Sequence, residues 1–219
     1  MPILATVQGN IGGGKSTLVE YLCSKYNENG DKKICFLQEP VDDWNTVKDC
    51  NGTTMLELFY GDQQRYAFGF QMMAYISRLA LLKRTVEQGY DIIISERSLD
   101  TDRHIFAKML YDDGKIIDVE YQIYLKWFDE FKTQFPEEKV IYIKTSPEIA
   151  HHRVEKRSRK GETIPFEYMQ KCHKYHEDWI KNISKDKVCV IDGNIDISEQ
   201  PETFNKWKKQ IDEYLSIVN

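Results

Sequence analysis

The chain has 219 residues, of which 41% are hydrophobic and 30% are charged, and its formal net charge is −5. This length and composition predict one globular domain over residues 1–219, with room for a sizeable core. The acidic balance argues against a general nucleic-acid binder, because such proteins are usually basic. We therefore expect no nucleic-acid partner.

The cysteines and the first residues bear on the compartment. Five scattered cysteines form no Cys-x-x-Cys pair, which indicates reduced thiols rather than a disulfide framework. The opening MPILATV lacks the basic region and long apolar run of a signal or transit peptide. No stretch approaches the ~20 apolar residues of a membrane span. We therefore expect a cytoplasmic protein with no membrane partner.

Short apolar runs alternate with longer segments of helical periodicity along the chain. The first run, 3–8, is predicted to be a buried strand, and residues 15–26 have helical spacing. Four more strands are predicted at 33–38, 91–95, 139–144 and 188–191. Helices are predicted over 63–88, 119–132 and 201–218, and from the favourable start Ser146-Pro147-Glu148.

Strands this apolar are expected to be covered on both faces, which favours parallel pairing and an α/β architecture. About five such strands with helices between them predict a doubly wound sheet. No repeat, low-complexity tract or interdomain linker interrupts the pattern, and turns are predicted at 112–114 and 192–194.

A glycine-rich stretch lies between the first predicted strand and the first predicted helix. It matches the pattern Gly-x-x-x-x-Gly-Lys-Ser/Thr. In this context backbone N–H groups surround phosphate oxygens, Lys15 contacts the β- and γ-phosphates, and the Ser16 hydroxyl suits Mg²⁺. The predicted nucleotide-phosphate site comprises Gly9, Asn10, Ile11, Gly12, Gly13, Gly14, Lys15, Ser16 and Thr17. The motif does not identify the molecule that receives a phosphate.

Charged side chains follow the second and third predicted strands: Glu39 after the second, Glu96 and Arg97 after the third. Ligands of open α/β sheets bind beyond the carboxyl ends of the strands, so these side chains should share a crevice with the glycine-rich stretch. Glu39 can accept the proton of an attacking hydroxyl, Glu96 can hold Mg²⁺ or act as the base, and Arg97 can neutralise a transferring phosphoryl group. The alternatives are a capping or salt-bridged Glu39 and a surface ion pair of Glu96 with Arg97.

A basic segment, RVEKRSRKGE, begins at Arg153 in this acidic protein. Arg153 and Arg157 are four residues apart and share one helix face. The segment is either a lid that closes over ATP phosphates and excludes water, or a solvated charged face. The residues alone do not favour one over the other.

These motifs together resemble those of the deoxyribonucleoside kinases. The stretches concerned are GNIGGGKST, EPVDDW, FGFQ with a downstream SR, ERSLDTDR, and RVEKRSRKGE followed by IPFEY, and they span nearly the whole chain. The resemblance implies a P-loop kinase-type fold with a helical lid at 153–163. It also implies Mg²⁺-dependent transfer of the ATP γ-phosphate to the 5′-hydroxyl of a deoxyribonucleoside, and a homodimer formed through a helical face.

The resemblance further implies roles for individual residues. Glu39 and Arg97 would contact the 5′-hydroxyl, and Glu96 would lie on the Mg²⁺ side; either carboxylate would accept the proton. Gln71 would bind the base edge, for which an amide suits because it both donates and accepts. The remaining implied contacts are Tyr60 and Glu162 with the 3′-hydroxyl, Val41, Trp44, Leu56, Phe70 and Phe106 with the nucleoside, and Arg153, Arg157 and Arg159 with ATP.

Two features refine this interpretation. The lid stretch KGET is about one residue shorter than the family's pattern, and Glu162 is its acidic residue.

Arg78 lies two helical turns after Gln71, and Asp102 stands where deoxycytidine- and purine-preferring relatives carry an Asp paired with that Arg. A buried Arg78–Asp102 pair would occupy the space of the thymine methyl. We therefore expect deoxycytidine or a purine deoxynucleoside to be preferred over thymidine.

Two other functions compete with this interpretation. A nucleoside-monophosphate kinase of the thymidylate type shares the loop and the lid, but its anionic acceptor would be repelled by Glu39. A GTPase-like switch would read guanine through an Asn/Thr-Lys-x-Asp stretch, and none lies in a suitable place.

Two further groups of residues are given no role in catalysis. The histidine pairs at 151–152 and at 173 and 176 lack a third ligand, so no histidine metal site is expected. Trp127, Phe128 and Phe131 are expected to pack in the interior, with part of this run available for a dimer face.

Overall fold

The computed structural model describes residues 1–26, 32–157, 164–195 and 200–217. Within these ranges, five strands form one sheet in the order β2-β3-β1-β4-β5, and each neighbouring pair is parallel. The strands are β1 (Ile3–Gln8), β2 (Ile34–Leu37), β3 (Ile92–Glu96), β4 (Glu138–Lys144) and β5 (Val188–Asp192). The predicted α/β fold with a five-stranded parallel sheet is confirmed.

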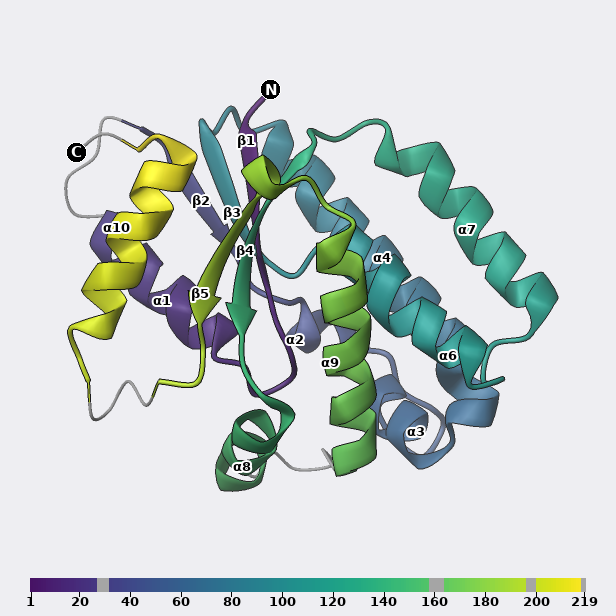
Figure 1. Cartoon of the computed structure of the whole chain (residues 1–219). Helices are drawn as coiled ribbons and strands as arrows, with labels where there is room; N and C mark the ends of the chain where they lie inside the picture. Colours follow the sequence, from purple (N-terminus) through teal and green to yellow (C-terminus); the bar gives the residue numbers. More distant parts are fainter. Residues whose placement is uncertain (27–31, 158–163, 196–199, 218–219) are drawn as a thin grey trace.

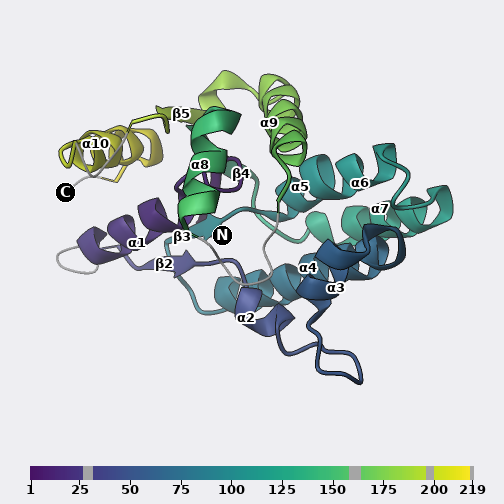
Figure 2. The same ribbon diagram turned by 90° about the horizontal axis from the view of Figure 1, so that it is seen from below.

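Helices cover both faces of the sheet (Figures 1 and 2). One face carries α1 (Lys15–Tyr26) and α10 (Thr203–Leu215), and the other carries α4 (Gln63–Val86), α7 (Asp118–Lys132) and α9 (Phe166–Lys181). The shorter helical segments are α2 (Val41–Trp44), α3 (Met55–Gly61), α5 (Leu99–Thr101), the π-helical η1 (Asp102–Ala107), α6 (Lys108–Asp112), α8 (Pro147–Arg157) and the 3₁₀ turn η2 (Lys185–Lys187).

The apolar run of β3 shows why the sheet is buried on both sides. Successive side chains of a strand point to opposite faces. Ile92 and Ile94 pack in the cluster that contains Leu18 of α1, whereas Ile93 packs in the cluster that contains Tyr75 of α4. The apolar run at the start of β3 therefore needs helices on both faces of the sheet, as the sequence predicted.

Element boundaries follow local signals closely. α1 has the predicted bounds, and α8 starts where predicted, with the Ser146 Oγ accepting a hydrogen bond from the Ile149 N–H at 3.4 Å. α2, α3, α5, η1 and α6 were not predicted. A signal for α3 was available, because Thr54 and Glu57 form a capping box at its start.

The expectation that the aromatic run of α7 packs inside is wrong for Trp127. Phe128 is 2% exposed, but Trp127 is 42% exposed. Neighbouring residues of a helix point about 100° apart, so α7, which contacts the molecule on one side, buries one of them and leaves the other in solvent.

In the parts of the chain that the structure describes, no helix is long and apolar enough to cross a membrane.

Candidate active site

One large cavity, of about 1020 Å³, opens at the carboxyl ends of β1, β2 and β3. The glycine-rich loop and α1 form one side of it, and α3 and α4 form the other. The predicted residues in its wall are Ile11, Gly12, Gly14, Lys15, Ser16, Thr17, Glu39, Val41, Trp44, Leu56, Tyr60, Phe70, Gln71, Glu96, Arg97, Asp102, Phe106, Arg153 and Arg157. Segments far apart in the sequence therefore meet at one site, as expected at this edge of an open α/β sheet.

Three other residues of the glycine-rich loop shape it without lining the cavity. Gly9 has a φ of +150°, and a Cβ there would lie 2.8 Å from the carbonyl oxygen of Ile143. The N–H of Gly13 donates to the carbonyl oxygen of Asn10 at 3.0 Å. The Asn10 side chain donates to the carbonyl oxygen of Met169 in α9 at 3.0 Å. These contacts fix the loop against β4 and α9.

Gly12 and Lys15 give the glycine-rich loop a shape and a charge that suit an anion. Gly12 has a φ of +72°, and a Cβ there would lie 2.3 Å from the carbonyl oxygen of Ala150, so the position requires glycine. The Lys15 Nζ donates to the loop carbonyl of Asn10 at 2.8 Å. Burial, together with the charge of Arg97, lowers the pKa of Lys15 to about 7. A phosphate chain in the loop would supply the negative charge that restores the ammonium form.

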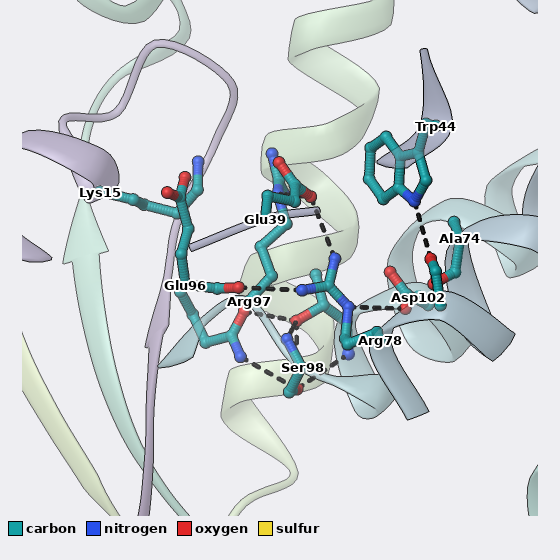
Figure 3. Close-up of polar contacts among 12 residues, drawn as sticks. Lys15, Glu39, Trp44, Ala74, Arg78, Glu96, Arg97, Ser98 and Asp102 are labelled. Carbon is teal, nitrogen blue, oxygen red and sulfur yellow. Dashed lines mark hydrogen bonds and ion pairs between the residues drawn. The ribbon is translucent and has the colours of Figure 1, made fainter. Parts of the chain in front are cut away.

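Glu39 lies between two arginines (Figure 3). Its Oε1 is 3.1 Å from the Nη2 of Arg78 and 3.0 Å from the Nε of Arg97. Burial alone would raise the pKa of Glu39, but the charges of Arg97, Arg78 and Lys15 lower it below its usual value. Glu39 is therefore an anion at neutral pH, and its side chain remains 22% exposed toward the cavity. Glu39 is thus salt-bridged, as the alternative interpretation expected, and it also faces the cavity, as the catalytic interpretation requires.

Glu96 is paired with the first turn of α1. Its Oε1 accepts a hydrogen bond from the Ser16 Oγ at 3.1 Å. A hydroxyl and a carboxylate are oxygen ligands of the kind that Mg²⁺ prefers, and Mg²⁺ usually keeps several of its waters, so this pair fits a magnesium site. Among the residues described, no group of three or more His, Cys, Asp or Glu could hold a metal ion.

Arg97 has a strained backbone at the end of β3. Its φ of 60° is in the left-handed region, which costs a non-glycine residue about 1–2 kcal/mol. Its N–H donates to the carbonyl oxygen of Val7 at 3.0 Å, and its guanidinium lies 4.6 Å from the ring centroid of Phe106. The Nη1 of Arg97 donates to no residue that the structure describes. This buried cation therefore has hydrogen-bonding capacity left for a ligand.

Arg78 lies behind the cavity wall and bridges three groups. It donates through Nε to the Asp102 Oδ2 at 2.9 Å, through Nη2 to Glu39, and through Nη1 to the carbonyl oxygen of Glu96 at 3.0 Å. The expected buried Arg78–Asp102 pair is present (Figure 3). Burial would lower the pKa of Arg78, but Asp102 and Glu39 raise it. The Arg78 guanidinium thus connects Asp102, on the side predicted to bind the base, with Glu39, on the side of the glycine-rich loop.

Aromatic side chains form the end of the cavity remote from the phosphate loop. Phe59 and Phe70 stack at 4.4 Å between centroids, and Trp44 meets Phe70 edge-on at 5.5 Å. Gln71 is 2% exposed and lines this end, and its Oε1 accepts no hydrogen bond from any residue within the described ranges. A buried acceptor without a partner is costly, so it suits a ligand that presents an N–H donor.

The basic segment is described only in part. Arg153 donates to the carbonyl oxygens of Gly193 and Ile195 after β5, at 2.9 and 3.0 Å, which anchors it beside the cavity. Arg157 also lines the cavity. The predictions for Arg159 and Glu162 lie outside the described residues.

Several residues of the cavity wall were not predicted from the sequence. They are Glu20, Gln38, Asp42, Asn45, Thr54, Glu57, Phe59, Ala74 and Tyr168. Tyr168 had a signal, because it belongs to the IPFEY stretch directly after the basic segment. The others are close in sequence to predicted residues, and periodicity alone does not show which side of a short helix faces a ligand.

A glycine-rich loop that precedes a helix, with a hydroxyl–carboxylate pair beside it at the edge of a parallel sheet, is typical of P-loop nucleotide-binding proteins. Comparison with known proteins narrows this class: residues 5–216 match the family model described as deoxynucleoside kinase. The chain belongs to that family, and it is a deoxynucleoside kinase. The family implies ATP as the phosphate donor and a deoxynucleoside as the substrate.

Individual relatives agree with this assignment. The chain is 35% identical to a probable deoxycytidine kinase of Fowlpox virus, over 87% of this chain and 78% of the relative. It is 33% identical to the human mitochondrial thymidine kinase 2, over 94% and 76%. It is 29% identical to deoxycytidine kinase 1 of Xenopus laevis, over 97% and 90%.

Proposed function

We propose that the protein transfers the γ-phosphate of ATP to the 5′-hydroxyl of a deoxyribonucleoside and forms the 5′-monophosphate for nucleotide salvage. The observation that carries the proposal is the Glu39 carboxylate in the same cavity wall as Lys15 of the phosphate loop. Lys15 would hold the phosphate chain, and the ionised Glu39 would accept a hydrogen bond from the neutral sugar hydroxyl.

Of the two carboxylates, Glu39 is proposed as the proton acceptor. The proposal that Glu96 lies on the magnesium side is supported by the hydrogen bond that it accepts from the Ser16 hydroxyl. The lowered pKa of Glu39 makes it a weak base, but phosphoryl transfer relies mainly on orientation and charge stabilisation. Glu39→Gln should therefore lower kcat by about 10²- to 10⁴-fold while ATP still binds. A kcat near that of the wild type would contradict this role.

Positive charge around the transferring phosphoryl group would come from Arg97 and from Arg153 and Arg157 of the proposed lid at 153–163. Ser16 and Glu96 would hold Mg²⁺, which when bound neutralises phosphate charge. The support for these assignments is that all five side chains line one cavity. Substituting Arg157 by Gln should raise the KM for ATP more than the KM for the nucleoside.

For the base, we propose a preference for deoxycytidine or a purine deoxynucleoside over thymidine. The supporting observation is the buried Arg78–Asp102 pair, which would occupy the space a thymine methyl needs. The unpaired acceptor of Gln71 suits a base of either kind, because thymine also presents an N–H donor. The named relatives include both deoxycytidine and thymidine kinases, so their names favour neither base. An ATP-dependent phosphorylation panel over the four natural deoxynucleosides tests the preference, and the highest kcat/KM for thymidine would overturn it.

A nucleoside-monophosphate kinase is the alternative. Its acceptor is an anion, and Glu39 would repel it at the attacking oxygen. Turnover of each deoxynucleoside should therefore exceed turnover of its monophosphate. Faster turnover of the monophosphate, unaffected by Glu39→Gln, would favour the alternative.

We also propose a homodimer formed through α4 and α7. These helices pack side by side, and they expose Ile76, Val119, Ile123 and Trp127. Static light scattering should give twice the chain's mass, and Trp127→Glu should shift it to the monomer. A monomeric wild type at micromolar concentration would contradict the proposal.

A cytoplasmic location is proposed because the five scattered cysteines form no Cys-x-x-Cys pair, a spacing that suits reduced thiols in a reducing compartment. Fluorescent tagging in the native host would test it.

A further inference from the structure

A ring of polar side chains, most of them buried, lies outside the residues that line the cavity and outside those assigned to the reaction. We call it the polar ring; it consists of Thr6 and Gln8 of β1, Ser98, Asp100 and Thr101 after β3, and Lys132 with Glu138 between α7 and β4. The series of hydrogen bonds is closed, because it leaves the short segment after Arg97 through Ser98 and Thr101 and returns to that segment through Asp100. Polar groups are expensive to bury, so a closed and satisfied ring sets a specific geometry.

Gln8 is the central member of the polar ring. It is fully buried, and its Nε2 donates to the Thr6 Oγ1 at 3.0 Å and to the Ser98 Oγ at 3.1 Å. Its Oε1 accepts from the Thr101 Oγ1 at 2.5 Å. Both amide hydrogens and the carbonyl oxygen are therefore used, and the orientation of the amide is fixed by its partners.

Two of the three partners of Gln8, Ser98 and Thr101, belong to the turn of the chain after Arg97. Ser98 and Thr101 form a capping box, in which the Ser98 N–H donates to the Thr101 Oγ1 at 3.0 Å and the Thr101 N–H donates to the Ser98 Oγ at 3.2 Å. Arg97 precedes this box and has the left-handed φ of 60°, while Asp102 follows it. Gln8 itself precedes Gly9, the first residue of the phosphate loop. One side chain thus connects the phosphate loop with the turn that carries Arg97.

The rest of the polar ring connects the same turn with β4 and α7. The Thr6 Oγ1 donates to the Glu138 Oε2 at 3.2 Å, and the Glu138 Oε1 accepts from the Lys132 Nζ at 2.9 Å. Lys132 also donates to the Asp100 Oδ2 at 2.5 Å, within the segment that Gln8 holds. The turn is therefore fastened to β1, β4 and α7 at once.

We propose that Gln8 is a positioning residue for Arg97: through Ser98 and Thr101 it fixes the guanidinium relative to the phosphate loop. The inference rests on the proposed function, in which Arg97 neutralises the transferring phosphoryl group. A displacement of a catalytic group by about 1 Å can cost ~10²-fold in rate. Gln8 is fully buried and does not line the cavity, so its loss should affect kcat more than either KM.

The test is a double-mutant cycle on kcat with Gln8→Leu, Arg97→Met and the double variant of the full-length enzyme. Gln8→Leu keeps the side-chain size and removes all three hydrogen bonds. We expect it to lower kcat at least about tenfold, with both KM values changed by less than about threefold. In the Arg97→Met background, Gln8→Leu should lower kcat by less than about twofold, because its effect acts through Arg97.

A matched control is Thr85→Val, which removes a buried hydroxyl that donates to the Leu81 carbonyl at 2.9 Å, remote from the cavity. It should leave kcat unchanged even where it lowers the melting temperature as much as Gln8→Leu does. If Gln8→Leu does not fold, Thr101→Val replaces it, since it removes the donor to Gln8 and the Oγ1 that accepts from the Ser98 N–H in the capping box.

The outcomes separate two possible errors. If Arg97→Met lowers kcat and Gln8→Leu lowers it further by the same factor in both backgrounds, the positioning inference is wrong and the proposed function stands. If Arg97→Met retains the wild-type kcat, the proposed role of Arg97 is itself wrong. A wild-type kcat for folded Gln8→Leu would also overturn the positioning inference.

Discussion

Removal of the Arg78 guanidinium should be among the most destabilising single changes near the cavity. Arg78 is 4% exposed and donates hydrogen bonds to Asp102, to Glu39 and to the Glu96 carbonyl. In Arg78→Met the aliphatic part of the side chain is kept, but Asp102, itself 3% exposed, remains as a buried carboxylate without its partner.

The expected loss of unfolding free energy follows from the burial of Arg78 and Asp102. Breaking a buried ion pair by removing one partner costs about 3–5 kcal/mol, because the other charge is left uncompensated. Asp102→Ala should cost less, about 1.5–3 kcal/mol, since Arg78 still pairs with Glu39. In the double variant neither charge of the pair remains, so its cost should be smaller than the sum by ~1–3 kcal/mol.

The assay is equilibrium unfolding in urea of the wild type, Arg78→Met, Asp102→Ala and the double variant. Arg103→Met is the matched control: Arg103 pairs with Asp129 at 2.6 Å, but the Asp129 side chain is 63% exposed, so the loss of that ion pair should cost no more than ~1 kcal/mol. If the costs of Arg78→Met and Asp102→Ala add to within ~0.3 kcal/mol, the reasoning from a buried, coupled pair is refuted.

Three further predictions concern pH, magnesium and the phosphate loop. Burial lowers the pKa of His176 to about 3, so the unfolded chain binds a proton below its ordinary pKa of ~6.5 while the folded state does not. The stability that His176 contributes is complete above that pH and should fall by ~1.4 kcal/mol per unit as the pH drops toward 3, measured by urea unfolding at several pH values. Ser16→Ala should raise the Mg²⁺ concentration for half-maximal activity about 10-fold or more, because it removes one proposed ligand. Gly12→Ala should lower the melting temperature and abolish ATP binding by calorimetry, since its Cβ would lie 2.3 Å from the Ala150 carbonyl oxygen.

Each of these predictions has a matched control. His152→Gln, at an exposed position, should leave the pH dependence of stability unchanged, whereas His176→Gln should flatten it. Ser24→Ala, on the exposed side of α1, should not alter the Mg²⁺ requirement. Gly114→Ala has a positive φ but no atom within 4 Å of the new Cβ, so it should cost only backbone strain of ~1 kcal/mol. Equal effects of a test variant and its control would refute the corresponding argument.

The sequence by itself determined the sheet and the chemistry available at its edge. Runs rich in apolar residues specified the five strands, because a strand covered on both faces buries most of its side chains. Thr6 and Gln8 of β1 are buried polar exceptions, and they bond to each other. The glycine-rich loop was equally clear: its pattern depends on backbone freedom and helix polarity, which neighbouring residues decide. Parallel pairing then placed Glu39, Glu96 and Arg97 at the same edge.

Only the tertiary structure decided which side chains share partners across long stretches of chain. Gln8 and Ser98 are 90 positions apart, and Arg78 and Glu39 are 39 apart. Such contacts depend on strand order and on the direction in which each helix leaves the sheet, and no local periodicity encodes either. For the same reason the exposure of Trp127 could not be predicted from its apolar character: burial is set by the elements that pack against a residue.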